Sequence, residues 1–138
     1  MNCIIIDDDL MSRRVIEEFV ERTDQLILVN SYETAVDAIN AFNTGEDIDL
    51  IFLDIEMPEM NGYETCRRLK ENKESKEIPV IFLSGLHSTE EKLDAFEAGG
   101  VDYITKPFSV KEVVARVKAA LRRTTALEQE INGVEGML

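Results

Sequence analysis

The chain has 138 residues, of which 44% are hydrophobic, and this length and composition fit one globular domain with a single core. No stretch approaches the ~18 consecutive apolar residues that a membrane-spanning helix requires. The 28 acidic and 15 basic residues give a net charge of −13, which disfavours direct contact with nucleic acid or an anionic membrane, since both need a basic face. The excess of carboxylates suggests that some of them hold a metal ion.

The cysteines and the N-terminus indicate the compartment. Cys3 and Cys66 lie far apart in apolar surroundings, and we interpret them as buried free thiols in a reducing compartment rather than as a disulfide or a metal site. The first residues, MNCIII, lack the basic segment of a signal peptide and reach Asp7 almost at once. Both features predict a cytoplasmic protein.

Short runs of β-forming residues alternate with segments of helical periodicity. In chain order they predict a strand over residues 2–6, a helix over 10–22, a strand over 26–30, a helix over 33–42, a strand over 50–53, a helix over 62–72, a strand over 79–83, a helix over 89–98, a strand over 101–104 and a last helix from Val110. The Gly99-Gly100 pair is a natural C-cap for the fourth helix, and Ser109 is a good N-cap for the fifth.

In the first three helices, apolar residues recur at the spacing that places them on one side, which we expect to face the core. These residues are Met11, Val15, Phe19 and Val20, then Val36, Ile39 and Phe42, then Tyr63, Cys66 and Leu69. The strands are apolar throughout rather than alternating, as burial on both faces requires. Five strand–helix repeats of this kind predict an α/β fold with a parallel sheet and helices on both faces.

In such a sheet, ligands bind beyond the carboxyl ends of the strands, so the residues after each strand are the candidates for function. Polar side chains follow four of the predicted strands: Asp7, Asp8 and Asp9 the first, Asp54 and Glu56 the third, Ser84 the fourth, and Thr105 and Lys106 the fifth. The fold is expected to bring carboxylates, a hydroxyl and an ammonium to one edge of the sheet.

The chemistry of this set is specific. Carboxylates ~4 Å apart repel by about 4 kcal/mol for each pair at an effective dielectric near 20, so the cluster requires a cation. Oxygen ligands that fill only part of a coordination sphere suit Mg²⁺. Because Lys106 and Ser84 can meet an anion, the set describes a phosphoryl-transfer site in which Asp54 is the nucleophile.

Each of these residues also has an ordinary structural explanation when it is taken alone. Asp9 is interpreted as the N-cap of the first helix, and a single Ser or Lys after a strand is more often a turn residue. Four strand ends that carry complementary chemistry are hard to explain by coincidence. We therefore favour the functional interpretation of the set as a whole.

The segments IIIDDD, LIFLDIEMPEMNGYE, VIFLSG and DYITKPF, in this order and spacing, resemble the receiver domain of bacterial two-component response regulators. The resemblance covers residues 2–122. It implies a flavodoxin-like, doubly wound three-layer sandwich of five βα units with strand order 2-1-3-4-5. It also divides the chain into a receiver domain over residues 1–122 and a C-terminal helical extension or linker over residues 123–138.

The resemblance implies a role for each residue at the strand ends. Asp54 is the phosphoacceptor, which takes a phosphoryl group from a sensor histidine kinase or a phosphotransfer protein in a Mg²⁺-dependent reaction. Ser84 and Lys106 meet the phosphoryl oxygens, and Ser84 with Tyr103 forms the conformational switch. The implied Mg²⁺ ligands are Asp7, Asp8, Asp54 and the backbone carbonyl of Glu56. The bond between Lys106 and Pro107 is expected to be cis.

Two positions depart from the family pattern: Asn61, where many members carry Asp, and Gly85, where alanine is frequent. Glu56 and Leu86 match positions that influence how water reaches the acyl phosphate. Because an apolar Leu86 cannot orient an attacking water, the resemblance implies slow self-dephosphorylation.

The expected mechanism is a two-state switch triggered by phosphorylation. Its readout is expected on the face made by the helix over 89–98, the strand over 101–104 and the last helix. An output domain or a partner protein would bind there, and a homodimer through this face or through the C-terminal helix is a further possibility. Apart from its own phosphorylation and dephosphorylation, the domain is expected to catalyse nothing.

The C-terminal region carries two series of residues spaced by seven, which are Val110, Val117, Thr124 and Ile131, and Val113, Ala120, Leu127 and Val134. Two interpretations stay open. Either the first half of this region packs on the sheet and the rest frays, or the helix continues as a coiled-coil linker that dimerises the domain or leads to an output module.

Two alternatives to the receiver function are considered. A Mg²⁺-dependent aspartyl-nucleophile phosphatase also uses a strand-end Asp followed two residues later by an acid, which here is Glu56. No cap domain is evident, and the acidic pair precedes the nucleophile, so the receiver is favoured. A plain scaffold without phosphoryl chemistry is the third possibility, and it predicts no Mg²⁺ binding.

Overall fold

Strands and helices alternate along the chain. The computed structural model describes residues 1–23, 26–42, 47–57, 60–85, 89–106, 109–120 and 122, and for residues 89–92 only the backbone. The strands are β1 (Asn2–Ile6), β2 (Ile27–Tyr32), β3 (Leu50–Asp54), β4 (Val80–Ser84) and β5 (Asp102–Thr105). The helices are α1 (Leu10–Glu21), α2 (Ala35–Phe42), α3 (Gly62–Glu71) and α4 (Thr89–Glu97), followed by a helix over residues 110–120.

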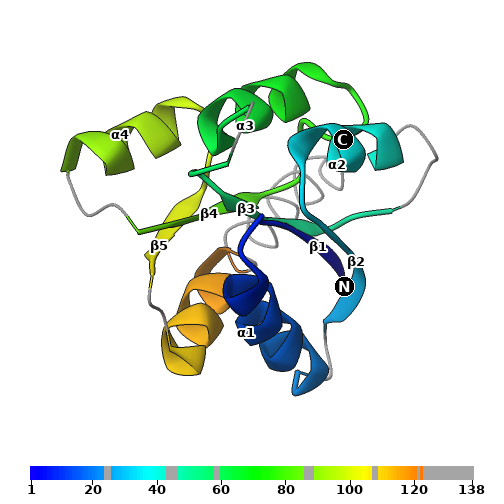
Figure 1. Ribbon diagram of the computed structural model, residues 1–138, viewed down its shortest axis with the longest axis vertical. Coiled ribbons are helices and arrows are strands. Elements are labelled where there is room, and N and C mark those ends of the chain that lie inside the picture. Colours follow the sequence, from blue (N-terminus) through cyan, green and yellow to red (C-terminus); the bar gives the residue numbers. More distant parts are fainter. Residues whose placement is uncertain are drawn as a thin grey trace, which may run out of the picture.

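The strands form one parallel sheet in the order β2-β1-β3-β4-β5. Figure 1 shows α1 and the helix over residues 110–120 on one face of this sheet, and α2, α3 and α4 on the other. The predicted three-layer α/β fold and its strand order are therefore confirmed. The order reverses direction between β1 and β3, and at such a point the carboxyl ends of neighbouring strands form the usual ligand site.

The inner strands β1, β3 and β4 are buried on both faces, as their apolar sequences predict, whereas the residues of the edge strand β2 are exposed or only partly buried. In β1, Cys3 and Ile5 pack toward α1 and the helix over residues 110–120, whereas Ile4 and Ile6 pack toward α2 and α3. Cys3 and Cys66 are both buried free thiols, as expected. Burial raises the pKa of each thiol to about 11, so both remain protonated and unreactive at neutral pH.

One predicted inward position in each of α1 and α2 is exposed, whereas Phe19, Val20 and Phe42 are buried as predicted. Met11 was expected to face the core, but its side chain is 67% exposed, because Ser12 and Arg13 occupy the inward side of the first turn of α1. Val36 was also expected to point inward and is 50% exposed. In α2 the small Ala35 and Ala38 are buried together with Phe42, which lets the helix backbone approach the sheet closely. Neither difference alters the sheet or the order of its strands.

The start of α3 packs directly on the end of β3. The backbone N–H of Gly62 donates to the carbonyl of Ile55 at 2.9 Å. A Cβ atom on Gly62 would lie 2.4 Å from the carbonyl oxygen of Asp54, closer than real Cβ contacts, so only glycine fits there. Asn61 caps the helix by accepting from the N–H of Glu64 at 3.0 Å. The packing of Gly62 against Asp54 and Ile55 thus fixes the backbone that carries the Asp54 side chain.

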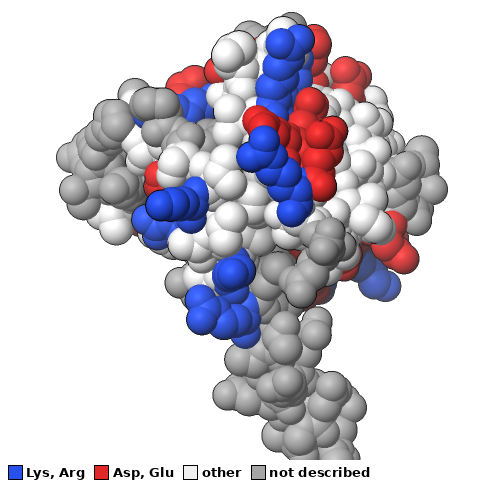
Figure 2. Space-filling model, turned by 90° about the horizontal axis from the view of Figure 1, so that it is seen from below, with Lys and Arg blue, Asp and Glu red and all other residues white. Residues whose placement is uncertain are grey.

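The outer surface is mixed in charge. Figure 2 views the face formed by α1 and the helix over residues 110–120, where the described Lys and Arg residues are separated by acidic and neutral ones. At the end of α1, Arg22 and Glu18 form a salt bridge, with 2.6 Å between Nη2 and Oε1. Within the described part of the chain, no helix is long and apolar enough to cross a membrane.

The close contact at Gly62 generates a first prediction. Replacing Gly62 with Ala should lower the free energy of unfolding by about 1–3 kcal/mol, because the new methyl group overlaps the backbone of Asp54 and Ile55. Urea unfolding followed by circular dichroism measures the change. The matched control is Gly85→Ala, since a Cβ there meets nothing within 4 Å. Equal stabilities of the two variants would show that the contact is not needed.

Candidate functional site

Three carboxylates meet where β1 and β3 end. Asp54 is the last residue of β3, and Asp7 and Asp8 directly follow β1. One oxygen from each of these residues lies within 4.8 Å of the others, so among the described residues this group could hold a metal ion. Asp7 and Asp54 are 0% and 1% exposed, whereas Asp8 is open to solvent. Two of the three carboxylates are therefore buried side by side.

Lys106 supplies the positive charge in this cluster. Its ammonium lies 3.1 Å from Asp54 Oδ1 and 3.1 Å from Asp7 Oδ2. The backbone positions it, because β5 ends at Thr105 and the N–H of Lys106 then donates to the carbonyl of Ser84 at 2.6 Å. The lysine thus bridges the two buried carboxylates from a third strand end.

One ammonium does not neutralise this cluster. Burial, and next the charge of Asp7, raise the pKa of Asp54 to about 8, although Lys106 acts in the opposite direction. Burial likewise raises the pKa of Asp7. For Lys106, burial disfavours the charged form, but the carboxylates of Asp54 and Asp7 outweigh it and raise the pKa. The site therefore holds excess negative charge that a proton or a cation must balance.

The donor set fits a cation. Asp7 Oδ2 is buried and accepts no well-aligned hydrogen bond from any described residue, although the Lys106 ammonium lies close to it. An oxygen in this position costs free energy unless it is coordinated. The three carboxylates share a site with one exposed member, which suits a hard cation that retains some of its water.

Arg13 holds the loop between β1 and α1, and sequence analysis did not single it out. Its Nη1 donates to the carbonyl of Asp7 at 2.7 Å, and its Nη2 pairs with Glu33 at 3.4 Å. The N–H of Asp9 donates to Asp7 Oδ1 at 2.8 Å. Asp9 itself caps α1, as predicted. The signal for Arg13 was its position three residues before Ile16, on the side of α1 that is buried.

Ser84 and Glu56 are also in contact. The hydroxyl of Ser84, at the end of β4, donates to Oε1 of Glu56, which lies two residues beyond the end of β3. Ser84 is buried, and Glu56 is exposed on the loop above it. Sequence analysis assigned Glu56 only a backbone carbonyl as ligand and a general influence on water, so its side-chain contact with Ser84 is new.

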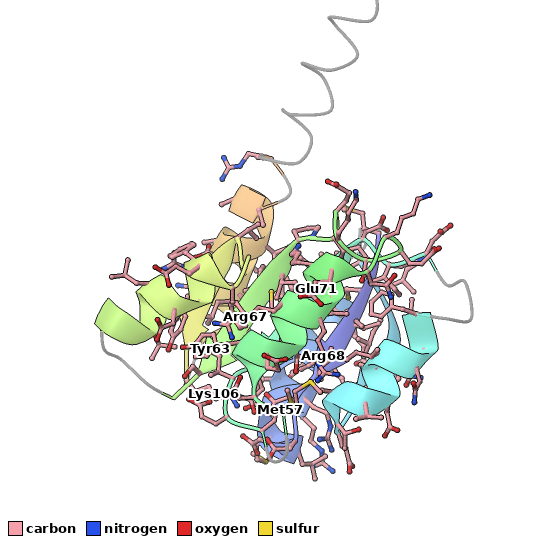
Figure 3. All side chains as sticks on the ribbon, turned by 90° about the horizontal axis from the view of Figure 1, so that it is seen from above. Met57, Tyr63, Arg67, Arg68, Glu71 and Lys106 are labelled. Atoms are coloured by element: carbon pink, nitrogen blue, oxygen red, sulfur yellow. The ribbon has the colours of Figure 1, made fainter. Side chains whose placement is uncertain are left out.

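Tyr103 occupies an inward position in β5. Its side chain is 5% exposed and belongs to the cluster of buried residues that includes Phe82. The ring of Phe82 also contacts Tyr63 of α3, with 5.6 Å between centroids. Figure 3 places Lys106, Met57 and Tyr63 toward the end of the molecule where α3 begins, and Glu71 near the other end of α3. Tyr103, Phe82 and Tyr63 thus pack in the part of the core that also contains residues of α3.

Some predictions concern residues outside the described part of the chain. These are the cis bond to Pro107, the role of Leu86 and the heptad pattern beyond residue 122. The cap at Ser109 is described and confirmed, since its hydroxyl accepts from the N–H of Glu112 at 3.2 Å. Gly99 has φ of 106° and ends α4 as expected.

Sequence comparison decides the family. A model of the response regulator receiver domain matches residues 3–118. The chain belongs to this family. The DNA-binding dual master transcriptional regulator RpaA of Synechocystis sp. is 35% identical over 128 residues, covering 91% of this chain and 51% of that protein. The transcriptional regulatory protein ResD of Bacillus subtilis is 39% identical over 122 residues, covering 88% of this chain and 48% of that protein. The chain spans about half the length of these relatives.

Solved receiver domains have the same fold. A putative response regulator from Chloroflexus aurantiacus superposes with a TM-score of 0.78 at 28% identity, covering 88% of this chain and 97% of that one. DrrB, a Thermotoga maritima OmpR/PhoB homolog, superposes with a TM-score of 0.72 at 36% identity, covering 88% of this chain and 52% of that one. The receiver-domain interpretation is confirmed, and the phosphatase alternative is not favoured.

The raised pKa of Asp54 predicts how stability depends on pH. Between the ordinary value of 3.8 and the folded value of about 8, the folded state binds more protons than the unfolded state. The resulting contribution to stability is complete below pH ~4 and is lost as the pH rises through ~8. In a chelating buffer, raising the pH from about 5 to about 9 should therefore lower the free energy of unfolding of the wild type relative to Asp54→Asn, by on the order of a few kcal/mol.

Urea unfolding at several pH values measures this difference. The matched control is Asp94→Asn, which removes an exposed carboxylate on α4 and should follow the wild-type profile. Parallel profiles for the wild type and Asp54→Asn would contradict the electrostatic description of the site.

Proposed function

We propose that this receiver domain accepts a phosphoryl group on the carboxylate of Asp54 and thereby changes conformation. The observation that carries this proposal is the Lys106 ammonium, 3.1 Å from both Asp54 and Asp7, with the exposed Asp8 beside them. The buried carboxylate is held rigidly at a strand end, and a positive charge is already aimed at the place where a phosphoryl oxygen would sit.

The proposed metal ion is Mg²⁺. Asp7, Asp8 and Asp54 would hold it through carboxylate oxygens, and the backbone carbonyl of Glu56 would complete the ligands from the protein. When bound, the ion neutralises phosphoryl oxygens and orients the donor. Its charge also favours the ionised form of Asp54, whose raised pKa otherwise keeps the nucleophile partly protonated at neutral pH.

The transfer step is a substitution at phosphorus. An oxygen of Asp54 forms a bond to phosphorus while the bond between phosphorus and the donor's imidazole nitrogen breaks, and the electron pair of that bond stays on the nitrogen. The ammonium of Lys106 and the hydroxyl of Ser84 then meet the oxygens of the acyl phosphate. The domain would catalyse only its own phosphorylation and dephosphorylation.

The proposed donor is a sensor histidine kinase or a phosphotransfer protein in the cytoplasm. The relatives are transcriptional regulators about twice as long, so an output domain is a proposed target of the switch. The proposed binding face comprises α4, β5 and the helix over residues 110–120. It exposes Leu93, Phe96 and Val110, at 57%, 51% and 38%. Exposed apolar residues on neighbouring elements are typical of a docking or dimer face, and the C-terminal helix is a second possible route to a dimer.

Phosphorylation by a small donor tests the assignment of Asp54. Incubation with Mg²⁺ and acetyl phosphate should add the mass of one phosphoryl group to the wild type, because the site supplies nucleophile and counter-charge itself. Asp54→Asn should gain no mass, and Asp94→Asn should behave as the wild type. Intact-protein mass spectrometry measures this. Steady release of phosphate without stable mass gain would instead support the phosphatase.

Thermal unfolding with and without Mg²⁺ tests the proposed metal site. A cation that binds only the folded state stabilises it by ~2.7 kcal/mol at a concentration about one hundred times its dissociation constant. Asp8→Asn should lose most of this stabilisation, because it removes one of the three carboxylates that would hold the ion. Asp94→Asn should keep it, because Asp94 is an exposed residue of α4 outside this group. A scaffold without a metal site would show no effect of Mg²⁺ in any variant.

A further inference from the structure

The contact between Ser84 and Glu56 lies next to the carboxylate cluster but uses none of its residues. The Ser84 hydroxyl donates to Oε1 of Glu56. Ser84 is at the end of β4 in the register where it pairs with Thr105, and the N–H of Lys106 bonds to its carbonyl. Its backbone is therefore fixed on the side of β5, and only the direction of its side chain remains variable.

The acceptor of this hydrogen bond, Glu56, is an exposed side chain on a loop, whereas the donor, Ser84, is buried at a strand end. Glu56 lies on the loop after β3, and its side chain is exposed to solvent. The loop backbone is tied down on both sides of it, since the N–H of Met57 and the N–H of Gly62 both donate to the carbonyl of Ile55, at 3.0 and 2.9 Å. A fixed backbone that carries a solvent-exposed carboxylate suits a group that holds a neighbour in one state and releases it in another.

The hydroxyl of Ser84 has one proton, so it can donate to one strong acceptor at a time. The proposed function requires that this proton be donated to a phosphoryl oxygen on Asp54. In the structure it is donated to a carboxylate, and hydrogen bonds to charged acceptors are about twice as strong as those between neutral groups. Phosphorylation must therefore break the bond to Glu56 before Ser84 can take its new partner.

We propose that the Glu56 carboxylate is a positioning residue that holds the Ser84 hydroxyl in the resting arrangement and opposes the phosphorylated one. The inference rests on the proposed function, because it presumes a phosphoryl group on Asp54. Glu56 acts through Ser84 and shifts the equilibrium between the resting and the phosphorylated arrangement toward the resting one. Removing its carboxylate favours the phosphorylated arrangement, since the cost of releasing Ser84 disappears.

A charge effect must be separated from this hydrogen bond. Glu56 is also a negative charge near a site that receives an anion, so any neutral substitution will favour phosphoryl binding to some extent. That electrostatic contribution does not depend on the hydroxyl of Ser84. The contribution of the hydrogen bond does, and a double-mutant cycle separates the two.

The probe is fluoroberyllate with saturating Mg²⁺, which mimics a phosphoryl group on a carboxylate, and its dissociation constant is measured by fluorine NMR. Glu56→Ala removes both charge and acceptor, whereas Glu56→Gln removes the charge and keeps a weaker acceptor. Each is measured with Ser84 intact and in combination with Ser84→Ala. Glu71→Gln is the matched control, because it makes the same charge change near the far end of α3 (Figure 3).

With Ser84 intact, Glu56→Ala should tighten fluoroberyllate binding about tenfold, and Glu56→Gln by an intermediate factor. In combination with Ser84→Ala, the two substitutions should give equal and smaller effects, about threefold or less, because only the charge effect remains. Glu71→Gln should leave the affinity unchanged.

Equal effects of Glu56→Ala with and without the Ser84 hydroxyl would overturn the inference and leave the proposed function standing. Weaker binding in Glu56→Ala would overturn it as well, because it would mean that the carboxylate supports the phosphorylated arrangement. A wild type that binds no fluoroberyllate would overturn both proposals. Thermal unfolding of each variant confirms that the affinities refer to folded protein.

Discussion

The burial of two neighbouring carboxylates beside a single ammonium is the constraint on which the rest of this site depends. Asp7 and Asp54 have almost no contact with solvent, and Lys106 lies 3.1 Å from each of them. Burial, and next the charge of Asp7, raise the pKa of Asp54 to about 8, because one ammonium does not compensate for two buried carboxylates. In the proposed function, binding of a cation would replace the proton on Asp54 and leave its carboxylate ionised for attack on the phosphoryl donor. A polar, open arrangement of the same residues would not couple the two events.

The fold holds this unfavourable arrangement in place by distributing its parts over rigid elements. Neighbouring parallel strands place Asp7 and Asp54 side by side, and β5 delivers Lys106 from the other side of β4. Contacts outside the cluster prevent the carboxylates from moving apart. Arg13 holds the carbonyl of Asp7, and Gly62 lets α3 press on the backbone of Asp54. Strain of this kind persists only where the surroundings determine the geometry more than once. Ser84 differs, because its hydroxyl is bound to an exposed carboxylate and can be released.

Much of this could be predicted from the sequence, because strands buried on both faces are recognisable and parallel strands end at the same edge. That logic brought Asp7, Asp54 and Lys106 together without coordinates. It could not show that Met11 and Val36 are exposed, since apolar residues at helical spacing leave the edge of the buried face undefined. In α1 the polar contacts of Ser12 and Arg13 occupy the inward side of the first turn. The hydrogen bond between Ser84 and Glu56 could not be predicted from the sequence either. It joins a side chain at the end of β4 to one on the loop after β3, and no periodic pattern encodes such a contact.

The proposed phosphoacceptor is Asp54 and not one of its acidic neighbours, Asp7 and Asp8. The most direct measurement is reduction with borohydride after treatment with Mg²⁺ and acetyl phosphate, followed by tandem mass spectrometry. Borohydride converts an acyl phosphate of aspartate into homoserine and leaves free carboxylates unchanged, so it marks the modified residue in the chain. If Asp54 is the phosphoacceptor, homoserine is expected at position 54 alone. Homoserine at Asp7 or Asp8, or none at any position in a protein that has gained phosphoryl mass, would contradict this assignment.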